Sequence, residues 1–227
     1  MRWGTPLPIS NREVKPISAD GTAVISGRVG RRQIFIKKPH NWGFFFIFIY
    51  MKLFAVYLGG RAKKCNTELH DVVFSYGNKI EDTYNDLLKK WFGLPDRLHI
   101  DSWVTLDNID GYEVLLKKQK SNDLNRLYFI NLGGYENNKF TELHENKFLI
   151  GSNQNEIKKR AKSTLLIDSN QVHTDDFYDI DDFIEIKKVG SYFIHLKKTK
   201  KENKLVFNNG YLPLPPKVIK SYKLSLL

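Results

Sequence analysis

Two histidines in this chain each follow a glutamate by two positions, as Glu68-x-His70 and Glu142-x-His144. If these segments are strands, both side chains of a pair lie on one face, because strand side chains alternate. A carboxylate beside an imidazole can serve as an acid–base pair or as two metal ligands. The alternative is structural. A phenylalanine four residues after each histidine is expected in the core on the same face, where a buried imidazole bonded to its neighbouring carboxylate is satisfied.

A second pattern places an aspartate two residues after a histidine, as His99-x-Asp101 and His173-x-Asp175. With the Glu-x-His pairs, it would complete a hydrolytic or metal-binding cluster in each half of the chain. The alternative is a loop before a strand, in which the aspartate caps a turn. The candidates for a catalytic or metal-binding role are therefore Glu68, His70, His99, Asp101, Glu142, His144, His173 and Asp175.

Other site motifs are missing from the sequence. The only cysteine is Cys65, so there is no zinc-type cysteine set and no intramolecular disulfide, which fits a reducing, cytoplasmic compartment. The sequence has no nucleophile elbow and no kinase motif. Gly59-Gly60 and Gly133-Gly134 lack the surroundings of a dinucleotide or phosphate loop, which favours structural turns. No cofactor is evident.

The candidate residues recur because the chain contains an internal duplication. Residues 53–60 read LFAVYLGG and precede TELH at 67–70, while residues 127–134 read LYFINLGG and precede TELH at 141–144. The copies realign without a gap from Asp101 onto Asp181, after an acidic insertion in the second copy. We assign repeat 1 to residues 51–122 and repeat 2 to 123–198. Two units of this size are marginal alone, so we expect them to pack as one pseudo-two-fold body.

Each repeat is predicted to be β-β-α-β-β. The first strand is almost continuously apolar, and the helix of repeat 1 has an apolar stripe from Ile80 to Trp91. The fold class is therefore α+β, with mainly antiparallel sheet. The predicted strands are 53–58, 71–76, 103–106 and 112–116 in repeat 1, and 127–132, 145–150, 183–186 and 192–196 in repeat 2.

Residues 1–50 match neither repeat. We interpret them as a non-repeat extension that arises from a misassigned start, with Met51 as the true start. The competing interpretations are an extra strand or partner-binding arm, and an export or membrane segment. The apolar run is too short for a membrane helix unless residues 43–58 act as one segment, so a membrane role is not favoured.

The net charge of +11 comes entirely from the two flanks, because residues 51–198 are net neutral. Nucleic-acid binding through the repeat body is therefore not favoured. Residues 199–227 form a basic C-terminal tail. In this tail Lys204–Phe207 is a possible strand, Asn208-Asn209-Gly210 indicates a turn, and the prolines at 213, 215 and 216 predict an irregular path along the surface.

The order of the motifs along repeat 1 resembles that of a bacterial family of unknown function numbered 1543. Members of this family carry the domain once or twice. The resemblance covers about residues 51–198 and rests on LFAVYLGG, ELHD, the helix containing Trp91, His99-x-Asp101-x-Trp103 and Gly111-Tyr112. Repeat 2 departs from it, since Phe183 replaces Trp103 and Ser191 replaces Gly111. The resemblance implies a small soluble protein and brings no catalytic residues.

The sequence thus favours a non-enzymatic binding or interaction module with an unidentified partner. The alternative is a small metal-dependent or acid–base enzyme that uses the Glu-x-His and His-x-Asp pairs. Whether this protein is an enzyme is left open.

Overall fold

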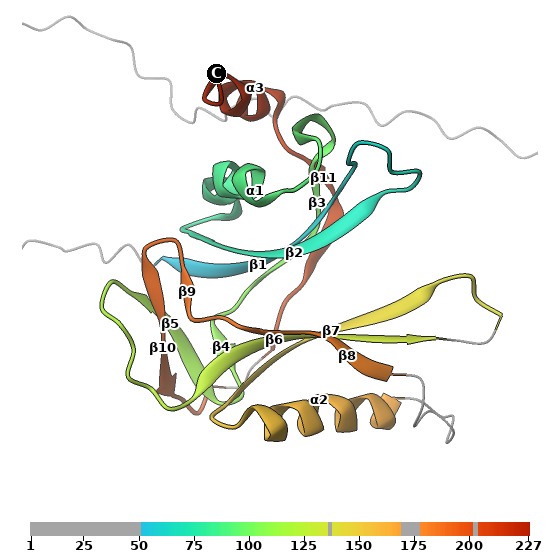
Figure 1. Ribbon diagram of the computed structural model, residues 1–227. Coiled ribbons are helices and arrows are strands. Elements are labelled where there is room, and N and C mark those ends of the chain that lie inside the picture. The colour runs from blue at the N-terminus through green and yellow to red at the C-terminus, as the bar shows by residue number, and fades with distance from the viewer. Residues whose placement is uncertain (1–50, 136–137, 169–177, 202–203) are drawn as a thin grey trace, which may run out of the picture. The chain divides into compact units, whose positions relative to one another are not determined.

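The computed structural model describes residues 51–135, 138–168, 178–201 and 204–227. These residues belong to one compact unit, Ile47–Leu227. The interpretations of residues 1–50 therefore lie outside the described part of the chain. Figure 1 shows two sheets facing each other, each covered by a helix on its outer side. In the described ranges, no helix is long and apolar enough to cross a membrane.

Repeat 1 contributes β1 (Lys52–Gly60), β2 (Leu69–Gly77), α1 (Tyr84–Lys90), β3 (His99–Thr105), β4 (Asn108–Ile109) and β5 (Tyr112–Lys117). Short 3-10 helices at Ile80–Thr83 and Pro95–Arg97 flank α1. Repeat 2 contributes β6 (Arg126–Tyr135), β7 (Glu142–Gly151), α2 (Gln154–Asp168), β8 (Tyr178–Glu185), β9 (Lys188–Val189) and β10 (Tyr192–Lys198). The predicted tandem α+β plan is confirmed, with the short strands β4 and β9 added.

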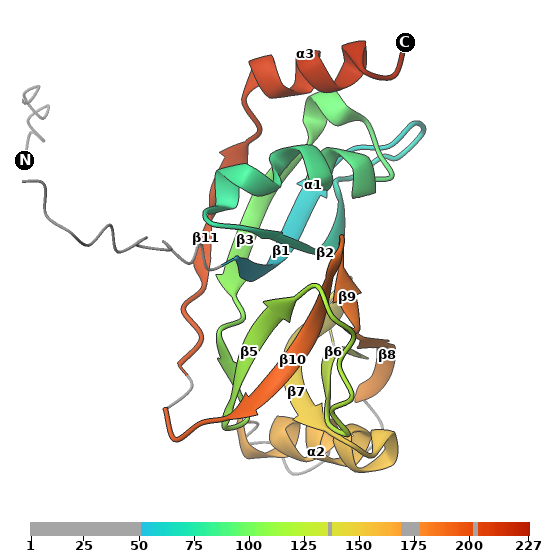
Figure 2. The same cartoon turned by 90° about the vertical axis from the view of Figure 1, so that its left-hand side faces the viewer.

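All strand pairings are antiparallel and form three sheets. The first-repeat sheet has the order β11-β3-β1-β2, and the second-repeat sheet has the order β7-β6-β8. The third sheet, β4-β5-β10-β9, takes two strands from each repeat, and we call it the shared sheet. Figure 2 shows β5 beside β10 in this sheet.

The shared sheet reveals an approximate two-fold axis. Leu115 pairs with His195, and Val114 pairs with Leu196. The repeat alignment makes Leu115 equivalent to His195 and Val114 equivalent to Ile194, which itself pairs with Leu116. The ladder therefore reads the same when the repeats are exchanged, so the axis passes between Leu115 and His195.

The first strand of each repeat, β1 or β6, is buried on both faces, which explains its nearly continuous apolar sequence. On β1, Phe54, Val56 and Leu58 pack toward α1, while Leu53 and Ala55 face the other repeat. The inward-facing side chains of both repeats form one core in which buried residues come equally from the two copies. This core closes one end of the space between the sheets and leaves the end with the Gly pairs for polar groups.

The C-terminal tail is more ordered than predicted. It forms β11 (Asn208–Pro213), which pairs with β3, and then α3 (Pro216–Leu224). Pro216 occupies the first turn of α3, where the missing N–H is not needed. Leu214 and Ile219 are buried among the apolar side chains between α1 and the first-repeat sheet, which we call the outer core. The prediction of an irregular tail is therefore wrong, because contacts with β3 and α1 of repeat 1 stabilise a strand and a helix in this segment.

Candidate functional site

A bulge in the same place in both repeats brings an aspartate to the Glu-x-His pair. On β3, Ser102 pairs with Tyr57 but Ile100 pairs with Leu58, so Asp101 is an extra residue. On β8, Asp182 pairs with Asn131 and Ile180 with Leu132, so Asp181 is the extra residue there. Such bulges turn a side chain out of its regular direction and are frequent beside active sites. Both β3 and β8 begin earlier than predicted, which places His99 and Asp101 inside a strand instead of a loop.

The first glycine of each Gly pair leaves room for the redirected carboxylate. A Cβ atom on Gly59 would lie 2.3 Å from Asp101 Oδ2 and 2.4 Å from His99 Nε2. A Cβ atom on Gly133 would lie 2.0 Å from Asp181 Oδ2. Real side chains do not approach a Cβ so closely, so any larger residue at either position requires the neighbouring carboxylate to move. The duplicated glycine and the duplicated Glu-x-His thus belong to one arrangement.

Repeat 1 gathers four of the candidates, and we call Glu68, His70, His99 and Asp101 the first cluster. His99 is 2% exposed, and its Nε2 lies 3.1 Å from Glu68 Oε1 and 3.3 Å from Asp101 Oδ1. The second carboxylate oxygen, Asp101 Oδ2, is 3.4 Å from His70 Nε2. Asp101 therefore lies between the two imidazoles.

The buried polar atoms of the first cluster are poorly satisfied. Within the part of the chain that the structure describes, His99 Nε2 and Asp101 Oδ2 are inaccessible and make no hydrogen bond of acceptable geometry, although charged neighbours lie close. His99 Nδ1 is 3.1 Å from the Arg97 carbonyl oxygen. Because a carbonyl only accepts, Nδ1 is the nitrogen that carries hydrogen, and Nε2 of a neutral ring presents its lone pair to the carboxylates.

Aromatic rings flank both imidazoles of the first cluster. Tyr57 stacks on His70 with ring centroids 5.3 Å apart, and Tyr211 of β11 lies 4.3 Å from the His99 ring. Burial raises the pKa of Tyr57, and the nearby Asp101 carboxylate raises it further. Repeat 2 has Asn131 in place of Tyr57, and Tyr211 follows the repeats, so sequence comparison of the two repeats missed both tyrosines.

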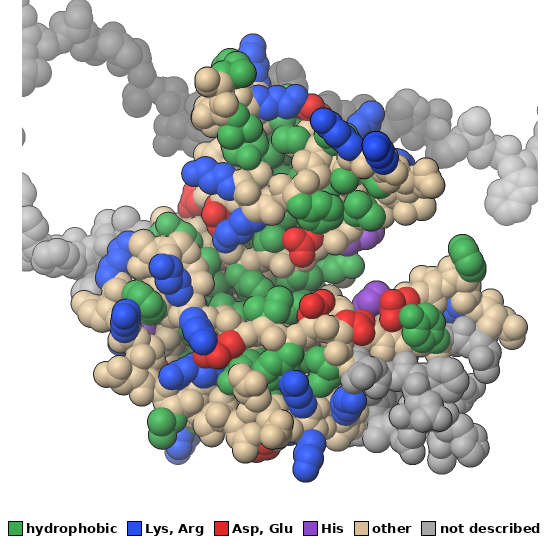
Figure 3. Space-filling view, viewed as in Figure 1, with side chains coloured by type: hydrophobic (Ala, Val, Ile, Leu, Met, Phe, Trp, Pro, Cys, Tyr) green, Lys and Arg blue, Asp and Glu red, His purple; other side chains and the backbone are tan. Residues whose placement is uncertain are grey.

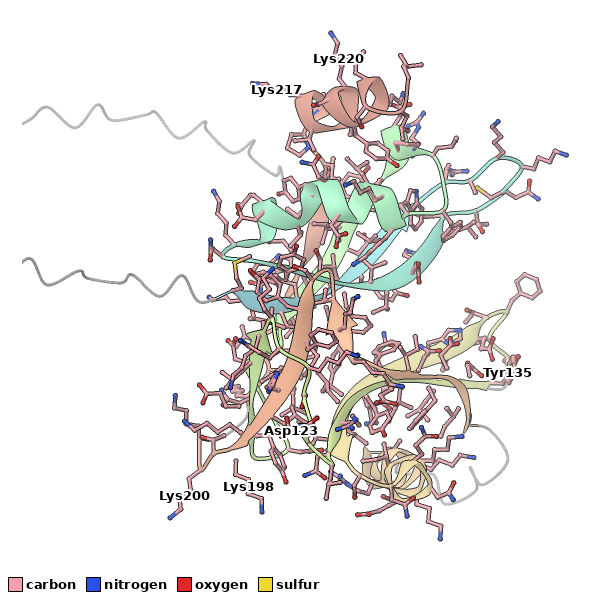
Figure 4. The ribbon with its side chains drawn as sticks, turned by 60° about the vertical axis from the view of Figure 1, so that its left-hand side comes forward. Asp123, Tyr135, Lys198, Lys200, Lys217 and Lys220 are labelled. Carbon is pink, nitrogen blue, oxygen red and sulfur yellow. The ribbon has the colours of Figure 1, made fainter. Side chains whose placement is uncertain are left out.

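Repeat 2 gathers a smaller and more exposed set, Glu142, His144 and Asp181, which we call the second cluster. His144 Nδ1 lies 3.3 Å from Asp181 Oδ2 and 3.1 Å from Asn131 Oδ1, and its Nε2 lies 3.7 Å from Glu142 Oε2. One donor atom from each of the three clustered residues falls within 4.8 Å of the others, which is compatible with a metal ion. A hydrogen bond between Tyr135 and Glu142 raises the pKa of Tyr135, which Figure 4 places at the far end of β6.

Among the described residues, the second cluster contains no counterpart of His99. His173 and Asp175 lie outside the described residues. In the strand register, His99 is opposite Gly59 and Asp179 is opposite Gly133, so an aspartate occupies the equivalent position. The ungapped match of Asp101 with Asp181 was the sequence signal that could have identified Asp181 as the second cluster's carboxylate.

A cleft between the two sheets connects the clusters. Its larger half, about 380 Å³, is lined by β1 and β2 of repeat 1 and by β6, β7 and β8 of repeat 2, with His70 and His144 both in its wall. Its smaller half, about 270 Å³, is lined by β1, β2 and β3 of repeat 1 and by β7 of repeat 2, again with His144. The repeat alignment converts most of one lining into the other, so the halves are related by the pseudo-two-fold axis. A wider hollow of about 750 Å³ beside α3 contains none of the clustered histidines.

The cleft is acidic although the repeat body is neutral. Of the residues that the structure describes, no lysine or arginine lines either half. Asp71 and Asp182 line the larger half, where burial and the charge of Asp182 together raise the pKa of Asp71 despite an opposing backbone hydrogen bond. Acidic and histidine side chains, in red and purple, face each other across the hollow on the right of Figure 3. Figure 4 shows basic residues elsewhere, with Lys217 and Lys220 on α3 and Lys198 and Lys200 at the end of β10.

Comparisons with known proteins agree with the duplicated architecture. The sequence pattern of the Domain of Unknown Function (DUF1543) matches residues 65–116 and 139–196, one segment in each repeat. The crystal structure of a protein Il1583 from Idiomarina loihiensis is similar, with 31% sequence identity and a TM-score of 0.59. The similarity covers 73% of this chain and 99% of that chain. No curated protein matches the sequence. The chain, with its two copies of the repeat, belongs to the DUF1543 family.

Proposed function

We propose that this protein is a binding module that takes a small organic cation with an apolar body into the cleft between its repeats. The observation that carries the proposal is the lining of the larger half of the cleft. His70 and His144 enter it from opposite repeats, with Asp71 and Asp182 beside the apolar Val72, Phe129 and Ile184. Pockets that combine an apolar wall with a few converging polar groups are typical ligand sites.

The charge of the lining selects the class of ligand. An anion would meet carboxylates without any lysine or arginine, and would lose its hydration without compensation. An ammonium or guanidinium group would instead pair with Asp182 and with Asp71. The raised pKa of Asp71 reflects the cost of holding its negative charge there.

The single cysteine is compatible with a cytoplasmic location, which we propose for this module.

Phenethylamine and phenylacetate test the proposal, because they share an aromatic body and differ in charge. Isothermal titration calorimetry of the full chain in EDTA should show binding of phenethylamine and not of phenylacetate. Asp182→Asn should weaken phenethylamine binding by about tenfold or more, as expected for loss of a charged hydrogen-bond partner. Asp96→Asn changes the net charge equally at an exposed position beside Lys223 and should have no effect. Equal binding of the two probes would reject the proposed ligand class.

The His–Asp contacts favour one second candidate, an acid–base enzyme acting on the cleft ligand. His70 is held by Asp101 and His144 by Asp181, as general bases commonly are. Glycine p-nitrophenyl ester carries an ammonium group and releases a coloured product when hydrolysed. Hydrolysis above the uncatalysed rate that disappears in His70→Gln and His144→Gln would support the enzyme, and a rate equal to that of buffer would reject it for this reaction.

A further inference from the structure

We propose that the first cluster binds one divalent transition-metal ion, with His99 Nε2 and the carboxylates of Glu68 and Asp101 as ligands and His70 beside them. This inference goes beyond the cleft ligand and does not depend on it. Glu68 directly precedes β2 and His70 lies on it, while His99 and Asp101 lie on β3. The bulge at Asp101 turns its carboxylate toward both imidazoles.

His99 has the geometry of a metal-binding histidine. Its Nδ1 lies at hydrogen-bond distance from the Arg97 carbonyl, which fixes the ring and leaves the lone pair of Nε2, on the side of Glu68 and Asp101, to bind a metal ion. Metal-ligating histidines commonly bond a carbonyl or carboxylate through their other nitrogen, because this contact sets the tautomer and orients the ring.

The pairwise distances in the cluster are compatible with side chains that close on one ion. His99 Nε2 lies 3.1 Å from Glu68 Oε1 and 3.3 Å from Asp101 Oδ1, and the other carboxylate oxygen, Asp101 Oδ2, lies 3.4 Å from His70 Nε2. Ligands bound tetrahedrally at about 2.0–2.1 Å are separated by roughly 3.3–3.4 Å. Glu68 and His70 are partly exposed, with side-chain accessibilities of 44% and 40%, so they can adjust to an ion.

The unsatisfied atoms point independently to a ligand. His99 is almost completely buried, yet its Nε2 and the adjacent Asp101 Oδ2 find no acceptable hydrogen-bond partner among the described residues. Leaving such groups unpaired away from water costs free energy. A cation at this point would satisfy both atoms and also offset the repulsion between the Glu68 and Asp101 carboxylates.

The donor set selects the class of metal. Mg²⁺ and Ca²⁺ prefer oxygen ligands, whereas imidazole suits Zn²⁺, Co²⁺ and related ions. The second cluster has the same Glu, His and Asp types, and one ligand atom from each lies within 4.8 Å of the others, but it has no buried imidazole, because Asp179 occupies the position equivalent to the buried His99. We therefore expect the first cluster to bind the metal more tightly than the second.

Titration of the tag-free full chain with ZnCl₂, CoCl₂ and MgCl₂ tests the site, with calorimetry for affinity and visible absorption of Co²⁺ for coordination. The expected result is one tight equivalent of Zn²⁺, a Co²⁺ spectrum of low coordination number, and no tight Mg²⁺ binding. Absence of tight Zn²⁺ binding, or equal affinity for Mg²⁺, would overturn the proposal. The metal titration contains no phenethylamine, so its outcome does not depend on whether the cleft binds an organic cation.

Matched variants test whether the tightly bound Zn²⁺ ion lies in the first cluster. Glu68→Gln preserves size at a partly exposed position and should weaken the tight equivalent at least about tenfold, because loss of a ligand costs at least as much as loss of an outer partner. Glu142→Gln in the second cluster should leave it unchanged. The opposite pattern would overturn the assignment. His99→Gln should abolish the Co²⁺ spectrum. If that variant does not fold, shifts of the His99 ring signals of the wild-type protein on Zn²⁺ addition decide the point, and unshifted signals contradict the proposal.

Discussion

At the scale of single residues, Gly59 and Gly133 are important because they lack a side chain. Each lies where a carboxylate from a bulged strand passes close to the backbone of the central strand. The sequence showed these glycines twice and suggested a turn, but both lie inside strands. What the sequence could not show is the bulge, because an extra residue becomes visible only when two strands are paired.

Alanine substitutions at the two glycines should differ in cost. In Gly59→Ala the new methyl group meets both Asp101 and the buried His99 ring, which cannot move into solvent. In Gly133→Ala it meets only the exposed Asp181 carboxylate, which can rotate away. We expect Gly59→Ala to destabilise the protein by about 2 kcal/mol or more, in the range of overpacking, and Gly133→Ala by clearly less. Urea unfolding of both variants measures the difference, and equal losses would contradict this account.

Asp123 should give a measurable pH dependence. Hydrogen bonds from Ser121 and from the Leu196 backbone, aided by the charges of His195 and Arg126, lower its pKa despite some burial. The pKa of Asp123 is lower in the folded protein than in the unfolded chain. The carboxylate therefore stabilises the fold fully at pH values above the unfolded-state pKa, and this stabilisation is lost as the pH falls through the folded-state pKa. Asp123→Asn should therefore cost about 1 kcal/mol at pH 7 and progressively less below about pH 4. A difference that is constant with pH in urea unfolding would reject this origin.

At the scale of elements, the paired strands were predictable and the C-terminal elements were not. The apolar run at residues 53–58 can be buried on both faces in only one kind of position, a central strand, and β1 is central. Asn208–Pro213 carries no comparable signal, and its strand exists because the edge of β3 is available for pairing. Pro216 was interpreted as excluding regular structure, although proline at the start of a helix is compatible with it.

Helix α3 should therefore contribute to the stability of repeat 1. Ile219 is 9% exposed and packs with Leu214 in the outer core that α1 also lines. Ile219→Ala should destabilise the protein by about 2–4 kcal/mol, as for other buried large-to-small changes. Lys220→Ala on the exposed side of the same helix is the control and should change stability by less than about 0.5 kcal/mol. Thermal or urea unfolding with no loss for Ile219→Ala would show that α3 does not contribute to folding.

At the scale of the whole molecule, the two repeats form one folding unit. The inner core draws on both copies, and β5 and β10 pair across the pseudo-two-fold axis. Fusion of the copies was predictable from the repeat length, since each is too small to bury enough surface alone. The position of the cleft was not predictable, because it depends on how the two sheets face each other.

A single repeat should not fold by itself. Residues 51–122 alone would expose Leu53, Ala55, Val104 and Val114, and would leave β5 without its partner. Circular dichroism and amide proton dispersion should indicate an unfolded or aggregated fragment, while the full chain gives one cooperative unfolding transition. A folded monomeric fragment would show that the shared core is dispensable. A folded dimer would instead reproduce the pairing of β5 with a second copy and would support it.

The imperfect symmetry of the cleft has a consequence for how a guest molecule is received. A cleft with identical halves would accept any guest in two equivalent orientations. Here Asn131 takes the place of Tyr57 and Asp182 that of Ser102 across the axis. The carboxylates of Asp71 and Asp182 line only the larger half, while the aromatic rings of Trp103 and Phe148 line only the smaller half. A guest with one aromatic end and one cationic end would therefore settle in a single direction. Divergence of the two copies after duplication has thus made the cleft asymmetric, so that it binds a guest in one orientation.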